Sequence, residues 1–406
     1  MSFEALVQWV QKNGGVVSSK LGVNETNPEN RFVYAKERIE LNEELFYIPS
    51  KCCIQPIDRT VPDEIPLSFK RDYLFILELM KEMNQEKDSF YFPYLSYLPS
   101  YASYINFPVI YLYFHRNELP QVQKENLYFP LILQRIETLD QIMNYMMREP
   151  IVQEYCSKFQ KPLQEGILYC YALIHSRSWN DHGLVPIADL FQHHADSQMF
   201  LESGCKMVTK KEYQVNQMIY DNYGVLDDTL MYLGFGFYDL MKQNFLVELS
   251  LPNYPSQVTQ LDKIKSFWLS QLPYKKYVLS SKEIYPPIVY YLRIYHLSEK
   301  DCQRIQWNTE TPFYESWISL ENELEVIKQL IQLLSRSKNF NQSMIDEANR
   351  VLQVYSPSSI HYGLASLTLI HEKIFKFNIE VLVQNWFSLL QVPFDVKLGL
   401  SNLFSK

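Results

Sequence analysis

Glycine is scarce in this chain, with 11 in 406 positions. Glycine serves where the backbone turns tightly or takes positive φ angles, so its scarcity suits a helix-rich chain with few glycine turns. Tyrosine and phenylalanine are abundant instead, at 30 and 24 residues. The hydrophobic share of 47% and the charged share of 21% match an ordinary globular protein. A length of 406 residues allows two domains.

Cysteine pairs of the C-x-x-C type are absent. The six cysteines lie at positions 52, 53, 156, 170, 205 and 302, a spacing that shows neither a zinc module nor a redox motif. We therefore expect no metal site, and buried or free thiols in a reducing compartment. On this basis we expect a cytoplasmic protein, with export to another cell left open.

An excess of basic residues is absent too. The chain has 38 Lys and Arg against 46 Asp and Glu, a formal charge of −8, whereas nucleic-acid binders usually carry a basic face. The amino terminus has no basic stretch followed by an apolar core, so no signal peptide is predicted. No uncharged apolar run reaches the roughly 18 residues that a membrane span needs. We expect a monomer that binds neither nucleic acid nor membrane.

The character of the sequence changes several times along the chain. Residues 1–60 contain short β-rich runs at 16–17, 31–35 and 44–48. Residues 66–170 have the apolar spacing of helices, and residues 171–245 return to one helix and short strands. From about 265 onward the apolar positions again follow a helical stripe. The predicted order is therefore β, helical, β, helical.

Three motifs occur in order within the second β region. They read HSRSW at 175–179, LVPIADLFQH at 184–193 and YGVLDDTLMYLGFGF at 223–237. An upstream segment reads SFYFPY at 89–94, followed by Leu98 and Pro99. Together they resemble a SET domain of the Rubisco-lysine-methyltransferase-like branch. The strings of that branch are roughly S-R-S-F, then L-P-x-A-D-x-x-N-H, then Y-G followed by G-F, with an upstream aromatic-Pro-Tyr and Leu-Pro signature.

The resemblance implies an α+β fold class. We expect a SET β-fold split by a helical insertion, followed by an all-helical carboxyl-terminal substrate-binding domain. The expected limits are 1–245 for the SET domain, with the insertion at about 61–170, and 265–406 for the helical domain.

The resemblance also implies an enzyme, a protein-lysine N-methyltransferase that uses S-adenosyl-L-methionine and acts on a protein substrate. A lysine ammonium has no lone pair, and its unperturbed pKa is about 10.4. An apolar channel lowers such a pKa because it disfavours the charged form. The chemistry thus needs an aromatic channel, a hydroxyl near the methyl group and carbonyl oxygens facing it. Neither a metal nor an acid–base dyad is required.

Site residues follow from matching the motifs one by one. Tyr223, before Gly224, is the expected catalytic tyrosine, whose hydroxyl helps to orient the amine and the methyl group. Arg177 is expected beside the cofactor carboxylate, and Phe237 against the adenine. The further cofactor contacts implied are Gln192, His193 and the backbone of Arg31, Phe32 and Val33. Taken singly, each side chain also suits a core or surface position, and the motif context favours the functional interpretation.

The acceptor side chain needs its own argument, because some members of the branch methylate histidine. Lysine-directed members tend to carry an aromatic residue two positions after the arginine and a small residue before the Asp. These positions hold Trp179 and Ala188, which we expect to line the substrate channel and which favour lysine.

Departures from the family pattern leave a second hypothesis open. The family's Asn is Gln192 here, and its G-R-G-x-x-A loop reads NRFVYA at 30–35. Asn30 tolerates unusual dihedral angles, whereas Phe32 does so only at a cost. The alternatives are therefore a catalytically degenerate SET-like binding module and a histidine-directed protein methyltransferase.

Overall fold

The computed structural model describes most of the chain. The described residues are 1–27, 31–126, 128–179, 182–194, 197, 204–224, 228–238, 246–248, 259–272, 278–280, 286–305, 312–315, 318–335 and 342–381. Asn30 and most of the stretch between 239 and 258 lie outside them. The chain divides into two compact units, the first made of residues 1–119, 130–226 and 230–237, the second of 120–129, 227–229 and 238–406. The predicted domain limits of 245 and 265 remain a prediction.

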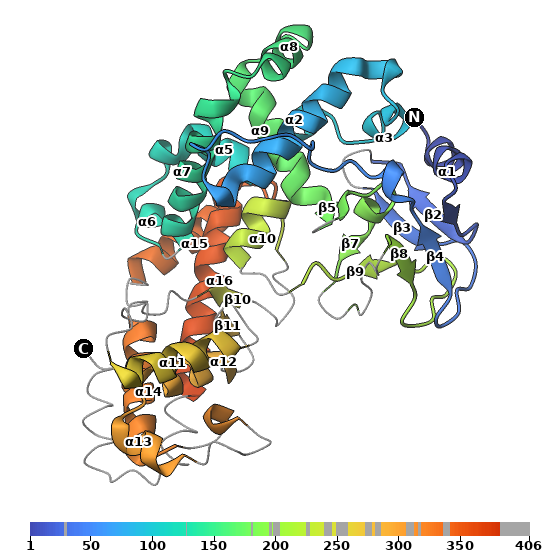
Figure 1. Cartoon of the computed structure of the whole chain (residues 1–406). Helices are drawn as coiled ribbons and strands as arrows, with labels where there is room; N and C mark the ends of the chain where they lie inside the picture. Colours follow the sequence, from blue (N-terminus) through green and yellow to red (C-terminus); the bar gives the residue numbers. More distant parts are fainter. Residues whose placement is uncertain are drawn as a thin grey trace. The chain divides into compact units, whose positions relative to one another are not determined.

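The strands of the first unit come from the two ends of its sequence. Helix α1 and the early strands are α1 (Phe3–Lys12), β1 (Val16–Val17), β2 (Leu21–Asn24), β3 (Phe32–Ala35) and β4 (Glu44–Tyr47). The later strands are β5 (Ser178–Trp179), β6 (Gly183–Leu184), β7 (Gln192–His193), β8 (Lys206–Val208) and β9 (Tyr220–Asp221). Figure 1 shows β2, β3, β4 and β8 gathered beside α1.

Pairing between these early and late strands builds the β region. Strand β4 pairs with β1 on one side and with β8 on the other, both antiparallel. Isolated bridges join Tyr34 to Met218, Ile39 to Tyr213, and Ile54 to Leu184. Strands β7 and β9 pair in parallel. The predicted β, helical, β order is confirmed, because the segments on either side of the helical insertion form one set of small sheets.

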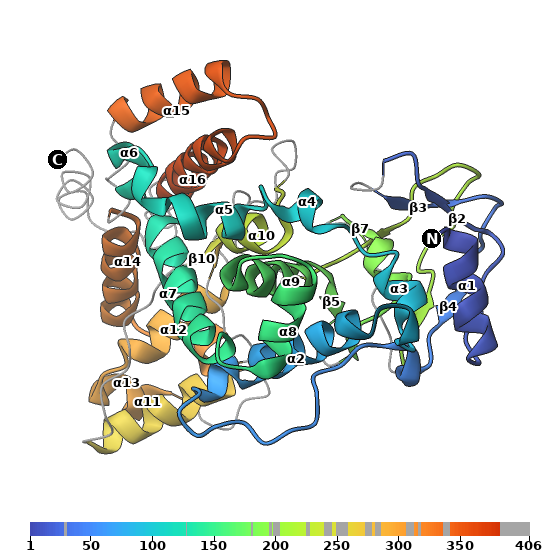
Figure 2. The same ribbon diagram turned by 90° about the horizontal axis from the view of Figure 1, so that it is seen from above.

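Helices fill the segment between the two sets of strands. They are α2 (Lys70–Gln85), α3 (Phe92–Leu95), α4 (Tyr101–Tyr104), α5 (Pro108–His115), α6 (Gln121–Lys124), α7 (Tyr128–Met146), α8 (Pro150–Lys158) and α9 (Leu163–Arg177). Helices α2, α8 and α9 pack against one another, as Figure 2 shows. Residues 166–174 of α9 are buried on every side, as expected for a helix in the centre of a core. This central helix ends at Arg177.

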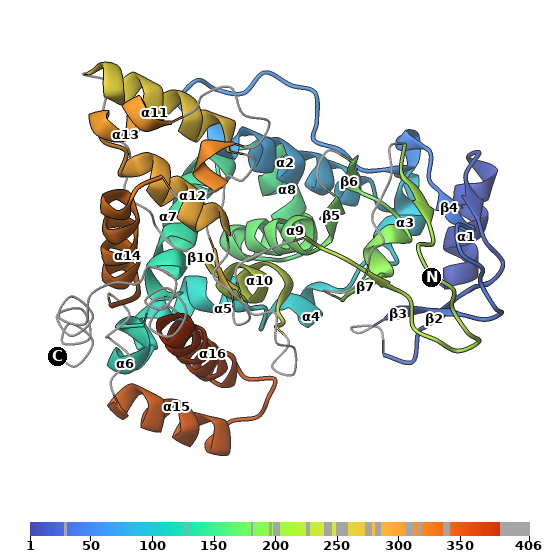
Figure 3. The same ribbon diagram turned by 90° about the horizontal axis from the view of Figure 1, so that it is seen from below.

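In its described residues, the second unit consists of helices and one two-stranded ribbon. Helix α10 (Asp228–Phe235) has residues 228–229 in the second unit and the rest in the first. The ribbon pairs β10 (Leu246–Glu248) with β11 (Val278–Ser280). The helices that follow are α11 (Gln260–Gln271), α12 (Pro286–Tyr295), α13 (Glu299–Arg304), α14 (Leu320–Ser335), α15 (Gln342–Val354) and α16 (Ile360–Val381). Figure 3 shows α15 alongside α16. Within the described residues, no helix is long and apolar enough to cross a bilayer.

A buried ion pair joins two helices of the second unit. On α12, Arg293 donates to both carboxylate oxygens of Glu323 on α14, at 2.6 and 3.2 Å. It also donates to the carbonyl of Tyr314 at 3.0 Å. Both ionic side chains are less than one-tenth exposed. Removing one partner of such a pair leaves an uncompensated buried charge, so the pair constrains how α12 and α14 pack.

The interior of the second unit also contains a buried histidine. His371 on α16 is 1% exposed, and among the described residues neither of its ring nitrogens has a hydrogen-bond partner. Its ring lies 6.2 Å from that of Tyr128. Burial lowers the pKa of His371 from 6.5 to about 3, so the side chain stays neutral when folded and binds a proton only on unfolding.

Acid is therefore expected to destabilise the protein through His371. A histidine whose folded pKa is depressed contributes full stability above its unfolded pKa and loses it as pH falls. Between pH 7.5 and 5, with the pKa values of 6.5 and about 3, the loss is about 2 kcal/mol. Urea unfolding of wild type and His371→Leu at both pH values measures it as a difference between the two proteins. A His115→Leu control, at an exposed histidine, should follow wild type, and a parallel pH dependence in His371→Leu would contradict the assignment.

Candidate active site

The motif residues are delivered by the ends of short elements in the first unit. Arg177 is the last residue of the buried helix α9. A 3-10 turn, η6 (Ala188–Leu190), precedes β7, which carries Gln192 and His193. Tyr223 follows β9 by two residues. The parallel pairing of β7 with β9 brings His193 opposite Asp221, so these segments meet although they are distant in sequence.

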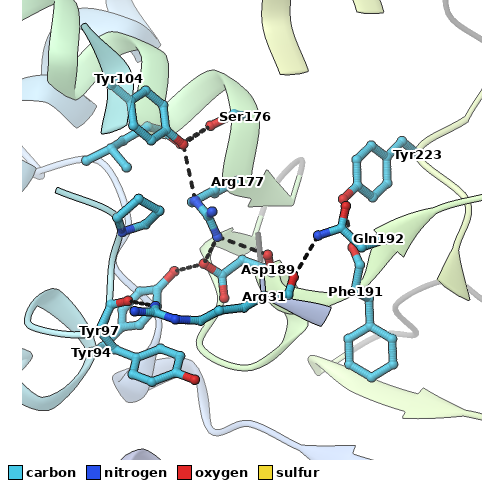
Figure 4. A network of polar contacts seen from close by, with 12 residues as sticks. Arg31, Tyr94, Tyr97, Tyr104, Ser176, Arg177, Asp189, Phe191, Gln192 and Tyr223 are labelled. Atoms are coloured by element: carbon cyan, nitrogen blue, oxygen red, sulfur yellow. Dashed lines mark hydrogen bonds and ion pairs between the residues drawn. The ribbon is translucent and has the colours of Figure 1, made fainter. Parts of the chain in front are cut away.

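Arg177 is held by a buried carboxylate. Its Nη1 donates to the Asp189 carboxylate and to the Asp189 carbonyl, each at 3.1 Å, and its Nε donates to the Tyr104 hydroxyl at 3.3 Å (Figure 4). The Asp189 carboxylate also accepts from Tyr94 at 3.1 Å. Burial raises the pKa of Asp189, and Arg177 and Tyr94 oppose that rise. Nη2 of Arg177 has no hydrogen-bond partner among the described residues, and the side chain is 18% exposed, so it keeps a free donor.

Arg31 supplies a second guanidinium in the same network. It lies over the ring of Tyr97, with Cζ 4.1 Å from the ring centroid, and donates to the Tyr97 carbonyl through Nη1. Its Nε is buried without a hydrogen-bond partner among the described residues. Leaving a buried donor without a hydrogen bond costs about 1–3 kcal/mol. The charges of Arg177 and Arg31 both act on the Asp189 carboxylate, and the unpartnered Nε of Arg31 gives the cluster a donor for an additional anionic or carbonyl oxygen.

Gln192 is hydrogen-bonded to the segment that stands where the family has its glycine-containing loop. Its Nε2 donates to the carbonyl of Arg31 at 2.8 Å (Figure 4). Phe32 is the first residue of β3, paired with Asn24, and its φ is not positive. The backbone here is therefore extended, and no glycine is required at that position. The Val33 carbonyl accepts from Ile219 at 2.9 Å. Phe32 and Val33 are thus fixed in β3, and the Gln192 side chain holds Arg31, the residue before it.

Tyr223 is oriented at both ends. Its hydroxyl donates to the carbonyl of Phe191 at 2.7 Å, and its backbone N–H donates to Nδ1 of His193 at 3.1 Å. Burial raises the pKa of Tyr223, so the hydroxyl remains a neutral phenol. A neutral phenol whose proton is already donated to a carbonyl keeps lone pairs for an incoming donor.

Aromatic rings pack close to the ring of Tyr223. The ring of Phe235 lies 4.8 Å from that of Tyr223, and the ring of Phe237 lies 6.3 Å from it. The His193 ring is 5.1 Å from Tyr223 and 6.2 Å from Phe237. Such separations are those of interacting aromatic pairs. The structure therefore brings Tyr223, His193 and Phe237 into one cluster, with Phe235 as a further member.

Similarity to known proteins is found in the structure and not in the sequence. No protein-family model and no curated protein matches the sequence. Solved structures do match over nearly the whole chain. The SET domain of LSMT bound to lysine and AdoHcy aligns with a TM-score of 0.60 at 16% identity, over 99% of this chain and 96% of the other. Rubisco LSMT bound to AdoMet aligns with a TM-score of 0.61 at 16% identity, over 98% and 96%. Rubisco LSMT bound to sinefungin and monomethyllysine gives a TM-score of 0.60 at 16% identity, over 99% and 97%.

The chain has the SET-domain fold of LSMT. At this level of identity the likeness establishes the fold, and the predicted fold class is confirmed. The SET fold also explains why the strands on either side of the insertion pair with one another.

The two residues expected to line the substrate channel stand apart from the aromatic cluster of Tyr223, His193, Phe237 and Phe235. Trp179 is half-buried on β5, opposite Gly183 of β6. Ala188 is fully buried in η6. Among the described residues no hydrogen bond or ring contact joins either side chain to Tyr223, so their channel role remains a prediction. Between these positions, Ile187 has a φ of 73°. A β-branched residue in that region is strained, and such strain clusters at functional sites.

Some residues of the site were not assigned from the sequence. Tyr94 contributes to the Arg177–Asp189 network, and its signal was present in the aromatic-Pro-Tyr signature at 92–94. Tyr104 and Phe235 had no such signal, because a tyrosine in a helical insertion and a phenylalanine in an apolar run look like core residues. Among the described residues no cluster of three or more His, Cys, Asp or Glu side chains could hold a metal ion.

Shortening Gln192 tests its role as the tie to Arg31. Gln192→Asn keeps the amide but removes one methylene, so the 2.8 Å bond to the Arg31 carbonyl should be lost. We expect S-adenosylmethionine binding to weaken by about 0.5–1.5 kcal/mol, the net value of one neutral hydrogen bond. Calorimetric titration measures it, with Gln214→Asn on an exposed loop as the control. Tighter binding in Gln192→Asn would instead show that the glutamine obstructs the cofactor.

Arg177→Ala should weaken S-adenosylmethionine binding by about 1.5–3 kcal/mol, the range for a hydrogen bond to a charged group. Because Arg177 also pairs with Asp189, the double variant Arg177→Ala, Asp189→Asn controls for the uncompensated buried carboxylate. Calorimetry of both proteins should show the loss, whereas unchanged affinity in the double variant would remove Arg177 from the cofactor site.

Proposed function

We propose that this protein is an S-adenosyl-L-methionine-dependent protein-lysine N-methyltransferase. The observation that carries the proposal is the convergence in one network of Tyr223, Gln192 and two guanidinium groups with unused donors. Support also comes from the solved structures of the same fold, which hold AdoMet, AdoHcy or sinefungin together with lysine or monomethyllysine in several cases.

The fit of the cofactor to this site rests on the unpartnered donors. Nη2 of Arg177 and the buried Nε of Arg31 each lack a partner among the described residues. Guanidinium groups hold carboxylates with charge-assisted hydrogen bonds, so these two would hold the methionyl carboxylate. Phe237 and His193 would flank the adenine, since a half-buried aromatic ring offers a stacking surface. Bound there, the cofactor supplies an electrophilic methyl group on its sulfonium.

The chain itself would orient the acceptor amine and exclude water. In-line displacement mainly requires positioning of the two reactants. The Tyr223 hydroxyl, held by the Phe191 carbonyl, would accept a hydrogen bond from the amine and fix the direction of its lone pair. The ring of Phe235, 4.8 Å from that of Tyr223, adds apolar surface beside it, and such surface lowers the pKa of a lysine ammonium by desolvation. The proton leaves to solvent as the amine enters the aromatic cluster and loses its hydration.

Lysine is favoured over histidine as the acceptor by the surroundings of Tyr223. The nearest rings are Phe235, Phe237 and His193. Among them only His193 can form a polar contact, and its Nδ1 already accepts from the Tyr223 backbone. An apolar aromatic wall suits the aliphatic stem of a lysine. An imidazole acceptor would need polar partners for its second nitrogen.

A non-catalytic binding module is the competing hypothesis, and it would retain the Arg177–Asp189 pair as a structural element only. A purified sample titrated with S-adenosylmethionine separates the two: saturable binding with labelled methyl transfer to proteins of a cell lysate supports the enzyme. Absence of binding in a folded sample would establish the module instead.

Tyr223→Phe is the direct test of the chemistry. It keeps the ring and its contacts with Phe235, and removes only the hydroxyl. Turnover is expected to fall by about 10²-fold or more, the lower range for a positioned catalytic group, while cofactor affinity and melting temperature change little. Single-turnover methylation measures the effect.

The matched control is Tyr220→Phe, on the adjacent strand β9, where the ring packs against His194. This variant should methylate at the wild-type rate. Equal rates for wild type and Tyr223→Phe would show that Tyr223 is not the catalytic tyrosine.

A further inference from the structure

Two buried cysteines of the first unit face each other. The sulfurs of Cys53 and Cys205 lie 3.8 Å apart, and each residue is 2% exposed. All six cysteines are free thiols. Because the two residues are 152 positions apart in sequence, only the pairing of early and late strands brings them together.

Backbone hydrogen bonds fix both cysteines beside the β4–β8 ladder. Cys53 follows a 3-10 turn, η1 (Ser50–Cys52), and its N–H donates to Ser50 at 3.0 Å. The carbonyl of Cys205 accepts from Ile48 at 3.0 Å, next to the pair formed by Tyr47 and Lys206. A disulfide has an S–S distance of about 2.05 Å. The sulfurs must therefore approach by about 1.8 Å from their 3.8 Å separation, within the reach of side-chain rotation.

The environment of the pair favours reaction at one sulfur. The hydrogen bond between the two thiols lowers the pKa of Cys205, and the same hydrogen bond together with burial raises the pKa of Cys53. The thiolate is the nucleophilic form of cysteine, so Cys205 is the attacking sulfur and Cys53 the resolving thiol. Cys53 lines a surface hollow of about 460 Å³ together with Lys51 and Lys81, which gives a small oxidant a path to the pair.

We propose that Cys53 and Cys205 are a modification site that forms a reversible disulfide with hydrogen peroxide as the oxidant. The Cys205 thiolate attacks one peroxide oxygen, the O–O bond breaks, and hydroxide leaves to become water. Cys53 then attacks the Cys205 sulfur, the S–S bond forms, the S–O bond breaks, and the departing hydroxide takes the Cys53 proton. Two thiols are oxidised and one peroxide is reduced to two waters. A dithiol reductant reverses the change.

The disulfide would act on a segment connected to the candidate active site. Ile54, next to Cys53, exchanges two backbone hydrogen bonds with Leu184, at 3.0 and 2.9 Å. Leu184 pairs in turn with Ser178, the residue after Arg177. A Cβ at Gly183 would lie 2.1 Å from the Ile54 carbonyl, so the two backbones are packed too closely here for a side chain. Closing the bridge thus joins the two sequence-distant halves of the β region covalently, with one of its cysteines next to the Ile54–Leu184 bridge.

The test uses the full-length protein and hydrogen peroxide, and it does not depend on the proposed activity. Non-reducing peptide mapping by mass spectrometry should find a Cys53–Cys205 cross-linked peptide with the loss of two hydrogens, reversed by dithiothreitol. The melting temperature of the oxidised protein should rise by about 5 °C, since the bridge closes a long loop. Cys170, which is fully buried and has a pKa raised by burial, should react at least about tenfold more slowly than the pair.

Three variants sharpen the result. Cys53→Ser should leave Cys205 able to form a sulfenic acid, detected with dimedone, without any cross-link. Cys205→Ser should abolish both products. Cys170→Ser, the matched control, should cross-link like wild type. If either pair variant fails to fold, differential alkylation of the wild type still reports which thiols react. A wild type in which Cys53 and Cys205 oxidise no faster than Cys170, or in which no 53–205 peptide forms, would overturn the proposal.

Discussion

The ion pair between Arg177 and Asp189 is the interaction on which the site depends most directly. It joins the end of the buried helix α9 to the η6 turn, and it draws in Tyr94 from α3 and Tyr104 from α4. A buried charge is tolerated only when it is paired and hydrogen-bonded. The carboxylate of Asp189, with a 3% exposed side chain, meets this condition through two partners, Arg177 and Tyr94. The ion pair therefore holds the end of α9, the insertion helices α3 and α4, and the η6 turn in fixed positions. These positions in turn set where Gln192 and the backbone before Tyr223 lie.

The same cluster shows how the chain accommodates an unusual loop. Glycines at such a position permit close backbone approach, yet Phe32 here is ordinary strand. The extra methylene of Gln192 reaches the Arg31 carbonyl, and the Arg31 side chain lies against Tyr97. The concern that Phe32 would force an unfavourable dihedral angle therefore does not apply. The positive φ lies instead at Ile187, within the turn that leads to Asp189.

Long-range strand pairing also explains why a thiol pair exists in this protein. Cys53 and Cys205 carry no sequence signature, because neither spacing nor neighbouring residues mark them as partners. They meet because β4 and β8 are adjacent strands in a SET fold. Strand β9, which leads to Tyr223, and strands β4 and β8 beside the cysteines belong to the same β region, so redox chemistry at one place and methyl transfer at another would share a scaffold.

The sequence by itself determined the β, helical, β, helical order, and its motifs predicted that Arg177, Gln192, His193, Tyr223 and Phe237 belong to one site. Helical periodicity and short β-rich runs are local properties, and the motifs preserved their order and spacing. The tertiary structure alone decided which atoms meet: that Arg177 binds Asp189, that Gln192 reaches Arg31, that Phe235 lies against Tyr223 and that Cys53 faces Cys205. Each of these contacts joins two segments that are 12 to 161 residues apart in the sequence. A local sequence pattern does not show which segments will meet, because burial and hydrogen bonding are satisfied by partners that only folding brings near.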